Sequence, residues 1–356
     1  MSQPRRYSAA LAPLAALLFG ASPPLCKILL GGASPLVAAS LLYLGSGAGL
    51  LALVAVRRAV RGGPASPPLR GRDWLLLLGA VASGAVLAPL LLLAGLLLAP
   101  ASVSSLLLNL ELVFTAVLAW WFFREGFERR VALGMAGIVL GCAVLSWPGR
   151  LETGGGLGAL AVAAACLLWG LDNNLTQALS ERDPVQVAAL KSLAGGAVNG
   201  VAAFAVGSSF PLAWTAPALL LVGFVCYGVS LLLFIASLRR VGTARTAAGF
   251  ALAPFVGAGL SFALLAEPVS PRFFAGLACV GAGLWLALAG RHEHTHTHEA
   301  LAHDHLHVHD EHHRHEHPDG ATPAGPHSHP HVHEPLTHPH AHFPDIHHRH
   351  GHGPDR

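Results

Sequence analysis

Histidine is missing from residues 1–291, and all 23 histidines of this 356-residue chain lie between His292 and His352. This absence excludes histidine-dependent catalysis and histidine metal ligation from the first part of the chain. Charge is scarce as well, because charged residues make up 12% of the chain, against about 25% in soluble domains. With 53% hydrophobic residues, the first part can bury its apolar surface only in a lipid bilayer.

Cysteine also offers little chemistry. The five cysteines stand singly in apolar segments and form no CxxC motif, so we interpret them as small core residues. No P-loop or other ATPase motif is present, and nothing predicts a nucleic-acid partner. An intramembrane enzyme is disfavoured because a catalytic base or metal centre built on histidine is excluded.

Long apolar windows fill the first part of the chain. A spanning helix needs about 20 predominantly apolar residues, and glycine, proline and charged positions divide the chain into ten such windows. They predict an all-α polytopic membrane protein with ten transmembrane helices and short connections. The windows are 8–30, 36–56, 74–98, 101–123, 131–147, 156–179, 184–206, 215–238, 243–265 and 271–290.

The distribution of arginine predicts how these spans are oriented. With the N-terminus inside, the cytoplasmic segments carry fifteen arginines and the opposite side carries only Arg150 and Arg272. This excess is the positive-inside pattern. We therefore expect an integral protein of a bacterial inner (plasma) membrane with both termini in the cytoplasm. The apolar run that follows Arg5-Arg6 continues past Lys27 without a clear cleavage site, which favours a retained first span over a signal peptide.

The chain also repeats itself weakly. The residues Leu17–Gly20 recur 150 positions later as Leu167–Gly170, and a shift of 142 aligns Glu125 with Glu267. Five spans are an odd number, so the second copy must be inverted across the membrane, an arrangement typical of secondary transporters. Chance similarity between segments rich in leucine, alanine and glycine is the alternative. The predicted division is a first five-helix repeat at 1–150, a second at 151–290 and a tail at 291–356.

Each repeat carries the same series of motifs. The first half has Leu18-Phe19-Gly20 followed by Lys27, then the run Ser104–Glu125 and the glycine spacing of Gly134–Gly141. In the second half the series is Trp169–Asp172, then the run Thr243–Glu267, then a glycine-rich closing helix. In this doubled order, residues 8–290 resemble two EamA domains of the drug/metabolite transporter superfamily. The resemblance implies a ten-helix carrier with both termini in the cytoplasm.

Two positions depart from the pattern of that family. Leu42-Tyr43 stands where many relatives have an arginine in the second helix, and Leu112 replaces the proline that often follows the glutamate of the fourth helix. The resemblance therefore does not indicate a substrate.

Polar and ionisable residues inside the spans are few, and because they are costly in a bilayer they are often functional. Asp172 lies within the sixth helix and Lys191 near the start of the seventh, so adjacent antiparallel helices could pair them. Asn173 and Gln177 are four residues apart and share a helix face. We place the set in a central polar cavity. The predicted substrate-binding residues are Lys27, Asn109, Glu111, Asp172, Asn173, Gln177 and Lys191.

Each of these residues also has a structural interpretation. Lys27 could reach the membrane surface from its helix end. Glu111 could be a partner for Lys27 or Asn109, and Asp172 with Lys191 could be an ion pair that holds the two halves together.

Two further glutamates, Glu125 and Glu267, lie at helix ends, and we interpret them as loop and cap residues rather than substrate ligands.

Without an ATPase motif, transport would be driven by an ion or substrate gradient. Proton coupling through Glu111 or Asp172 is a hypothesis.

The tail has the opposite chemistry. Residues 1–290 carry a net charge of +9 and residues 291–356 a net charge of −6 with histidine neutral. The tail has almost no apolar residues, which predicts disorder. In an extended chain residues i and i+2 point the same way, so its HxH runs could present several imidazoles to Zn²⁺, Ni²⁺ or Co²⁺. The predicted ligands are His292, His294, His296, His298, His303, His305, His307, His309, His312, His313, His315 and His317.

Two other interpretations of the tail remain open. It could be a bystander segment of low complexity, or a charge switch, because histidine gains its proton near pH 6.5. Transport itself requires no cofactor in either case.

Three functions compete for the whole chain. It could carry a small metabolite while the tail binds metal, carry a divalent metal ion (Zn, Ni or Co), or anchor a metal sensor or store that transports nothing. The lack of histidine in the spans argues against a metal path, and the duplicated architecture argues against a store. We predict a secondary-active transporter of a small metabolite or similar solute, working by alternating access in the bilayer, with a homodimer as one option for its assembly.

Overall fold

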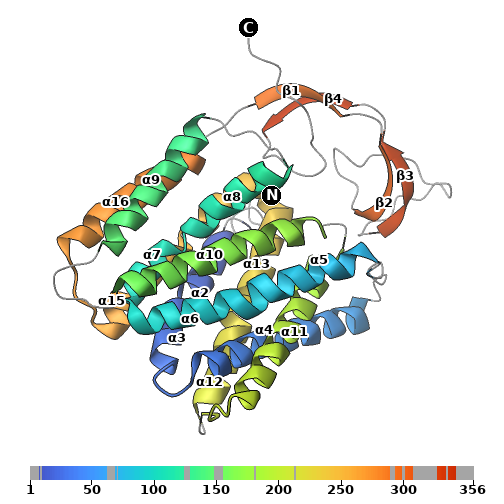
Figure 1. Ribbon diagram of the computed structural model, residues 1–356. Helices are drawn as coiled ribbons and strands as arrows, with labels where there is room; N and C mark the ends of the chain where they lie inside the picture. The colour runs from blue at the N-terminus through green and yellow to red at the C-terminus, as the bar shows by residue number, and fades with distance from the viewer. Residues whose placement is uncertain are drawn as a thin grey trace.

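The structure is a computed structural model, and it is almost entirely helical up to residue 288 (Figure 1). It describes residues 8, 10–61, 69, 71–123, 129–147, 155–179, 182–211, 214–288, 293–298, 301–307, 327–333 and 336–341.

Ten helical segments of the described chain are long and apolar enough to cross a membrane, which confirms the predicted fold class. The fourth, Ala101–Phe122, lies within one residue of its predicted window, and the others agree to within a few residues. The helices of the first half are α2 Leu11–Gly20, α3 Ser22–Leu29, α4 Pro35–Arg61, α5 Arg72–Ala80, η1 Val81–Leu87, α6 Ala88–Leu98, α7 Ala101–Leu107, α8 Leu110–Phe123 and α9 Arg129–Ser146. Those of the second half are α10 Gly155–Gln177, α11 Pro184–Ala205, α12 Thr215–Val222, η2 Gly223–Val229, α13 Ser230–Val241, α14 Thr243–Phe250, α15 Ala253–Leu265 and α16 Pro271–Leu288.

The two halves repeat each other in their irregularities. The third and eighth spans each contain one π-helical segment, and η1 begins at Val81, 142 residues before η2 begins at Gly223. The closing helices obey the same shift, since α9 begins at Arg129 and α16 at Pro271. The fourth and ninth spans are also both interrupted, after Leu107 and after Phe250. Shared defects of this kind support a duplicated five-helix unit, inverted because each copy has an odd number of spans.

The closing helices α9 and α16 pack side by side at the edge of the bundle (Figure 1), and glycines line their contact. A Cβ added at Gly134 would lie 2.6 Å from the carbonyl oxygen of Gly283, and one added at Gly141 would lie 2.9 Å from that of Gly276. Small residues let the two backbones approach this closely. The glycine spacing seen in the sequence thus corresponds to one helix–helix contact between the halves.

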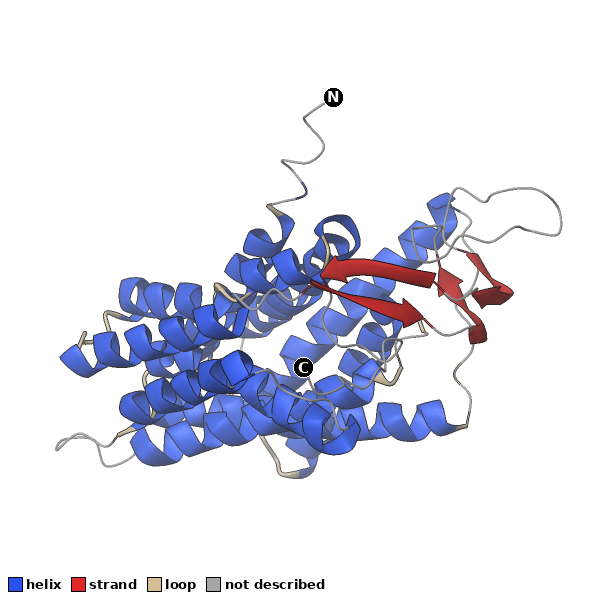
Figure 2. Cartoon of the chain, turned by 90° about the horizontal axis from the view of Figure 1, so that it is seen from above, coloured by secondary structure: helices blue, strands red, loops and turns tan. Residues whose placement is uncertain are grey.

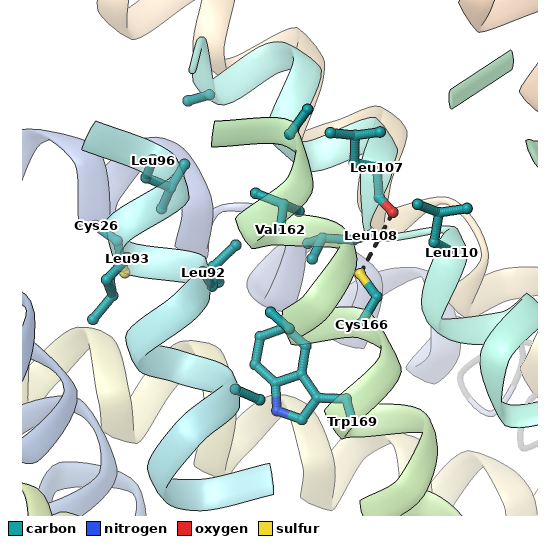
Figure 3. Packing of buried hydrophobic residues seen from close by; sticks show 14 of the residues in the cluster. Cys26, Leu92, Leu93, Leu96, Leu107, Leu108, Leu110, Val162, Cys166 and Trp169 are labelled. Carbon is teal, nitrogen blue, oxygen red and sulfur yellow. Dashed lines mark hydrogen bonds between the residues drawn. The ribbon is translucent and has the colours of Figure 1, made fainter. Parts of the chain in front are cut away.

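A large apolar core lies between α6, α7 and α10 (Figure 3). Leu93, Leu96 and Val162 are almost completely buried there. The thiol of Cys166 donates to the carbonyl oxygen of Leu107 at 3.5 Å, at the interruption of the fourth span. Cys166 is therefore a core residue that also satisfies a carbonyl where the helical ladder is broken.

Four segments of the tail are described. They form four strands in two antiparallel pairs, drawn as red arrows in Figure 2. Alternation of histidine with another residue has the period of a strand, and strand pairing satisfies backbone groups without requiring an apolar core. The strands are β1 Glu293–His298, β2 Leu301–His307, β3 His327–His333 and β4 Leu336–Ala341, with β1 paired to β4 and β2 to β3.

Candidate functional site

Helix α10 carries three consecutive polar residues, Asp172, Asn173 and Asn174. Successive helical residues are about 100° apart, so the three side chains contact different neighbours. Asp172 contacts Lys191, Asn173 contacts Glu111, and Asn174 donates to the carbonyl oxygens of its own helix and of α8. The polar cluster of the bundle is organised around this one turn.

The carboxylate of Asp172 forms an ion pair with Lys191 on α11. The ammonium group donates to both carboxylate oxygens, at 2.9 and 2.7 Å, and the hydroxyl of Thr176 donates to Oδ1 at 3.0 Å. The side chains are 5% and 18% exposed. This confirms the pairing of adjacent antiparallel helices predicted from the sequence, and it leaves Asp172 with its charge balanced.

Glu111 has a different environment. It lies half-buried at the start of α8, and its Oε1 accepts a hydrogen bond from Asn173 Nδ2 at 2.8 Å. The same amide donates to Thr115 Oγ1 at 3.2 Å. Among the described residues no Lys or Arg nitrogen lies within 4.0 Å of this carboxylate. The partners expected for Glu111, Lys27 or Asn109, are thus replaced by Asn173 from the other half.

The π-helical segment η1 supplies the backbone next to this cluster. Pro89 has no N–H, and the N–H of Ala88 bonds to Ser83 five residues back, so the carbonyl groups of Gly84 and Ala85 lose their usual α-helical donors. Side chains from other helices replace these donors. The carbonyl oxygen of Gly84 accepts from the Tyr43 hydroxyl at 2.8 Å and the Trp169 indole at 3.0 Å, and that of Ala85 accepts from Asn199 at 3.2 Å.

Aromatic rings extend from this point through the second half. The ring of Tyr43 lies 6.0 Å from that of Tyr227, which is 5.8 Å from Phe19. Phe19 is 5.5 Å from Phe250, and Phe250 is 4.9 Å from Phe234. The sequence analysis did not predict this series, because its members are spread over five elements and share no spacing.

Asn109 and Lys27 lie apart from the cluster. Asn109 is buried at the interruption between α7 and α8, and its Nδ2 donates to Leu106 of its own chain segment at 2.8 Å. Lys27 donates to the carbonyl oxygen of Ala99 at 2.6 Å and lies 3.7 Å from Glu267. Within the described residues, neither makes a hydrogen bond or an ion pair with the cluster around Asp172.

Glu267 is a helix cap, as expected, although the helix it caps belongs to the other half of the chain. Its two carboxylate oxygens accept from the N–H groups of Ala101 and Ser102 at 2.6 and 2.9 Å, at the start of α7. A carboxylate at this position satisfies free donors and complements the positive end of the helix dipole. Glu125, which received the same interpretation, lies outside the described residues.

At the opposite ends of the spans a second ion pair joins the halves, and the sequence analysis missed it. Arg182, between α10 and α11, donates to Asp73 in the first turn of α5 at 3.1 and 2.6 Å.

Gln177 lies half-buried at the end of α10, four residues beyond Asn173. Of the predicted histidine ligands, His294, His296, His298, His303, His305 and His307 lie in strands, and His292, His309, His312, His313, His315 and His317 lie outside the described residues.

The comparisons with known proteins address the whole helical part of the chain. The model of the EamA-like transporter family matches twice, at residues 6–147 and 156–289. The chain belongs to this family. The two matches correspond to the two structural repeats, and they identify an integral membrane transporter embedded in the lipid bilayer, in a family whose members are transporters rather than enzymes.

Two similar proteins add detail to the EamA assignment. An uncharacterized transporter of Methanothermobacter thermautotrophicus is 32% identical over 270 residues, which cover 72% of this chain and 78% of the relative. The crystal structure of another protein matches with a TM-score of 0.59 at 19% identity, and the match covers 79% of this chain and 95% of the other. The first similarity supports transport and the second supports the fold alone.

Proposed function

We propose that this EamA-family transporter is a secondary-active carrier of a small organic metabolite, working by alternating access and coupled to a gradient through Glu111. The observation that carries the proposal is the hydrogen bond between Glu111 and Asn173, which joins a carboxylate of the first half to an amide of the second within the spans.

Charge balance supports this role for Glu111. Asp172 and Lys191 neutralise each other, so the three ionisable groups of the cluster carry one net negative charge when Glu111 is ionised. A carboxylate inside a membrane protein is costly without a cation or a proton. Glu111 is therefore the group that can gain and lose a proton or a cation during a transport cycle, whereas Asp172 keeps its ion pair with Lys191.

The neighbouring groups favour an organic solute. Asn173 is exposed although it lies within a span, and Tyr43 begins the series of aromatic rings that extends through the second half. Small-molecule sites typically combine aromatic walls with a few polar groups that fix orientation. This combination would bind a solute that has both a hydrogen-bonding group and an apolar part.

Two ion pairs at opposite ends of the spans suit alternating access. Lys27 ends the first span and meets Glu267, which follows the ninth, whereas Asp73 begins the third span and meets Arg182, which follows the sixth. Consecutive spans alternate in direction, so the two pairs lie on opposite faces of the membrane. Each joins one repeat to the other, and we infer that opening either face breaks the pair on that face.

The tail completes the proposed function as a binding site for Zn²⁺, Ni²⁺ or Co²⁺ on the cytoplasmic side, where the positive-inside pattern would place it. Transport of such a metal is the competing function. Among residues whose side chains the structure describes, no group of three or more His, Cys, Asp or Glu side chains is placed to hold a metal ion.

The test of transport uses the full chain in proteoliposomes with an imposed pH gradient and a mixture of amino acids, amines and organic acids, whose uptake is followed by mass spectrometry. We expect uptake of at least one solute to depend on the gradient, and Glu111→Gln to abolish that dependence. Glu152→Gln, the same change of residue type between the fifth and sixth predicted spans, is the control and should keep it. Gradient-dependent uptake by the Glu111 variant equal to that of the wild type would refute coupling through this residue.

A cellular measurement separates solute from metal transport. Zn, Ni, Co and Cu are measured in cells that lack the protein, express it whole or express residues 1–290. We expect solute uptake to survive in the truncated form. A change in the level of one metal that requires the tail would instead establish metal handling as the function.

A further inference from the structure

The strand register places histidine opposite histidine along the tail. In the β2–β3 pair His303 faces His331, His305 faces His329 and His307 faces His327. The β1–β4 pair adds two more such matches, His294 with His340 and His296 with His338. Five cross-strand histidine pairs thus arise from segments that are 20 to 46 residues apart in the sequence.

Both pairs of strands share one register. His294 and His340 lie 23 residues on either side of position 317, and His303 and His331 lie 14 residues on either side of the same position. The four strands therefore follow the register of a single long hairpin.

The sequence itself matches this hairpin. Histidine occupies even positions at 292–298 and odd positions at 303–309, then odd positions at 327–333 and even positions at 338–342. The alternation changes phase once on each arm, between the same two pairs of strands. A register symmetric about position 317 pairs residues of equal parity, so it brings histidine to histidine in both blocks, whereas a shift of one residue would bring it to none.

Such a register brings histidine positions next to one another. Positions two apart in a strand and positions directly opposite in the paired strand are neighbours in a sheet. His303, His305, His329 and His331 therefore occupy four neighbouring positions of the register. Neutral imidazole suits Zn²⁺, Ni²⁺ and Co²⁺, and four nitrogen ligands satisfy the tetrahedral preference of Zn²⁺.

We propose that the tail is a metal-closed ribbon, in which opposing histidines of its two arms bind a divalent ion of the zinc, nickel or cobalt class, with His303, His305, His329 and His331 as the central site. This rests on the metal-binding tail of the proposed function and adds His327, His329, His331, His338 and His340 to its ligands. An isolated two-stranded ribbon is marginally stable in water, so the bound ion provides the link that holds the arms together.

Competition between matched variants tests the ribbon. The full chain in detergent is titrated with Co²⁺, whose visible absorption reports tetrahedral coordination, and the bound ion is displaced with Zn²⁺. H303N/H305N/H307N removes one arm of the central site and H327N/H329N/H331N removes the other. H312N/H313N/H315N removes the same number of histidines from the segment between β2 and β3.

We expect either arm variant to weaken the tightest binding at least tenfold and to lose the tetrahedral spectrum, and the third variant to retain both. Equal weakening in all three variants would show a flexible tail with interchangeable histidines and would overturn the ribbon. Because this measurement does not involve transport, failure of the ribbon and failure of the carrier are distinguished by separate readouts.

A second measurement reads the register directly. Leu306 and Ser328 are opposite each other on the face that does not carry the histidines. Leu306→Cys with Ser328→Cys should form a disulfide under mild oxidation when Zn²⁺ is present and much less after chelation. Leu306→Cys with Pro330→Cys is offset by two residues and should form it poorly, and equal cross-linking of both combinations would contradict the register.

Discussion

The carboxylate of Asp172 lies directly against the Cα of Gly84, so close that a Cβ at Gly84 would overlap it. The absence of a side chain at Gly84 is therefore what allows Asp172 to reach Lys191 while Tyr43 and Trp169 bind the carbonyl group of the same glycine. Helix α10 and the third span fit together at this one residue.

Gly84→Ala should consequently disrupt the ion pair of Asp172 and lower both transport and thermal stability in detergent, because the side chain of Asp172, from its Cβ to its carboxylate, leaves no room for the methyl group. Gly259→Ala is the matched control, since nothing lies within 4 Å of its added Cβ. We expect the control to retain the wild-type unfolding temperature or to exceed it slightly. Equal unfolding temperatures for both variants would show that Gly84 tolerates a side chain.

The ion pair between Asp172 and Lys191 should behave as a unit. Asp172→Asn or Lys191→Met alone leaves one buried charge without its partner, which costs roughly 3–5 kcal/mol in proteins. The double variant removes both charges and should recover much of that loss. Unfolding of the three variants in detergent gives the coupling free energy, and additive losses would mean that the two groups do not interact.

The carbonyl oxygen of Gly84 accepts hydrogen bonds from two side chains, Tyr43 and Trp169. Removing both donors should therefore lower the stability of the protein by more than the sum of the two single losses. Tyr43→Phe and Trp169→Phe should each be mild, because the remaining donor still satisfies the carbonyl. Together they leave a buried acceptor unsatisfied, which costs about 1–3 kcal/mol. Unfolding midpoints of the two single variants and the double variant test this, and a double variant no worse than the sum of the singles would contradict the shared acceptor.

The two ion pairs on opposite faces should bias the carrier in opposite directions. Lys27→Met weakens the pair with Glu267, and Arg182→Met weakens the pair with Asp73. Asn173→Cys serves as the reporter, and its labelling by an impermeant maleimide is measured from each side of the membrane. We expect one variant to increase labelling from one side and the other variant to increase labelling from the opposite side. Labelling that changes in the same direction in both would remove these pairs from the gating model.

The sequence was sufficient for the features that depend on local pattern. Span positions followed from apolar length, and the pairing of Asp172 with Lys191 followed from the turn between adjacent helices. Contacts between residues far apart were not predictable. Glu111 was assigned the wrong kind of partner because no pattern connects α8 to Asn173, 62 residues further along the chain.

The pairing of strands in the tail was also not predicted from the sequence. Composition predicted disorder because the segment cannot bury apolar surface. The alternation of His303 and its neighbours was used only for i and i+2 geometry, although the reversed phase of histidine after His327 carries information about pairing between distant segments. Composition shows how much apolar surface a segment can bury, whereas the register of a hairpin depends on which residues of its two arms lie opposite each other.

The line of glycines between α9 and α16 has a mechanical consequence. Gly134 and Gly283 bring the two backbones into direct contact, and the nearest side-chain atom to Gly134 is the methyl group of Ala287. If one repeat rocks against the other during transport, we expect the motion to turn about this contact and leave it closed. The closing helices would then form the axis of the motion, and its amplitude would grow with distance from them.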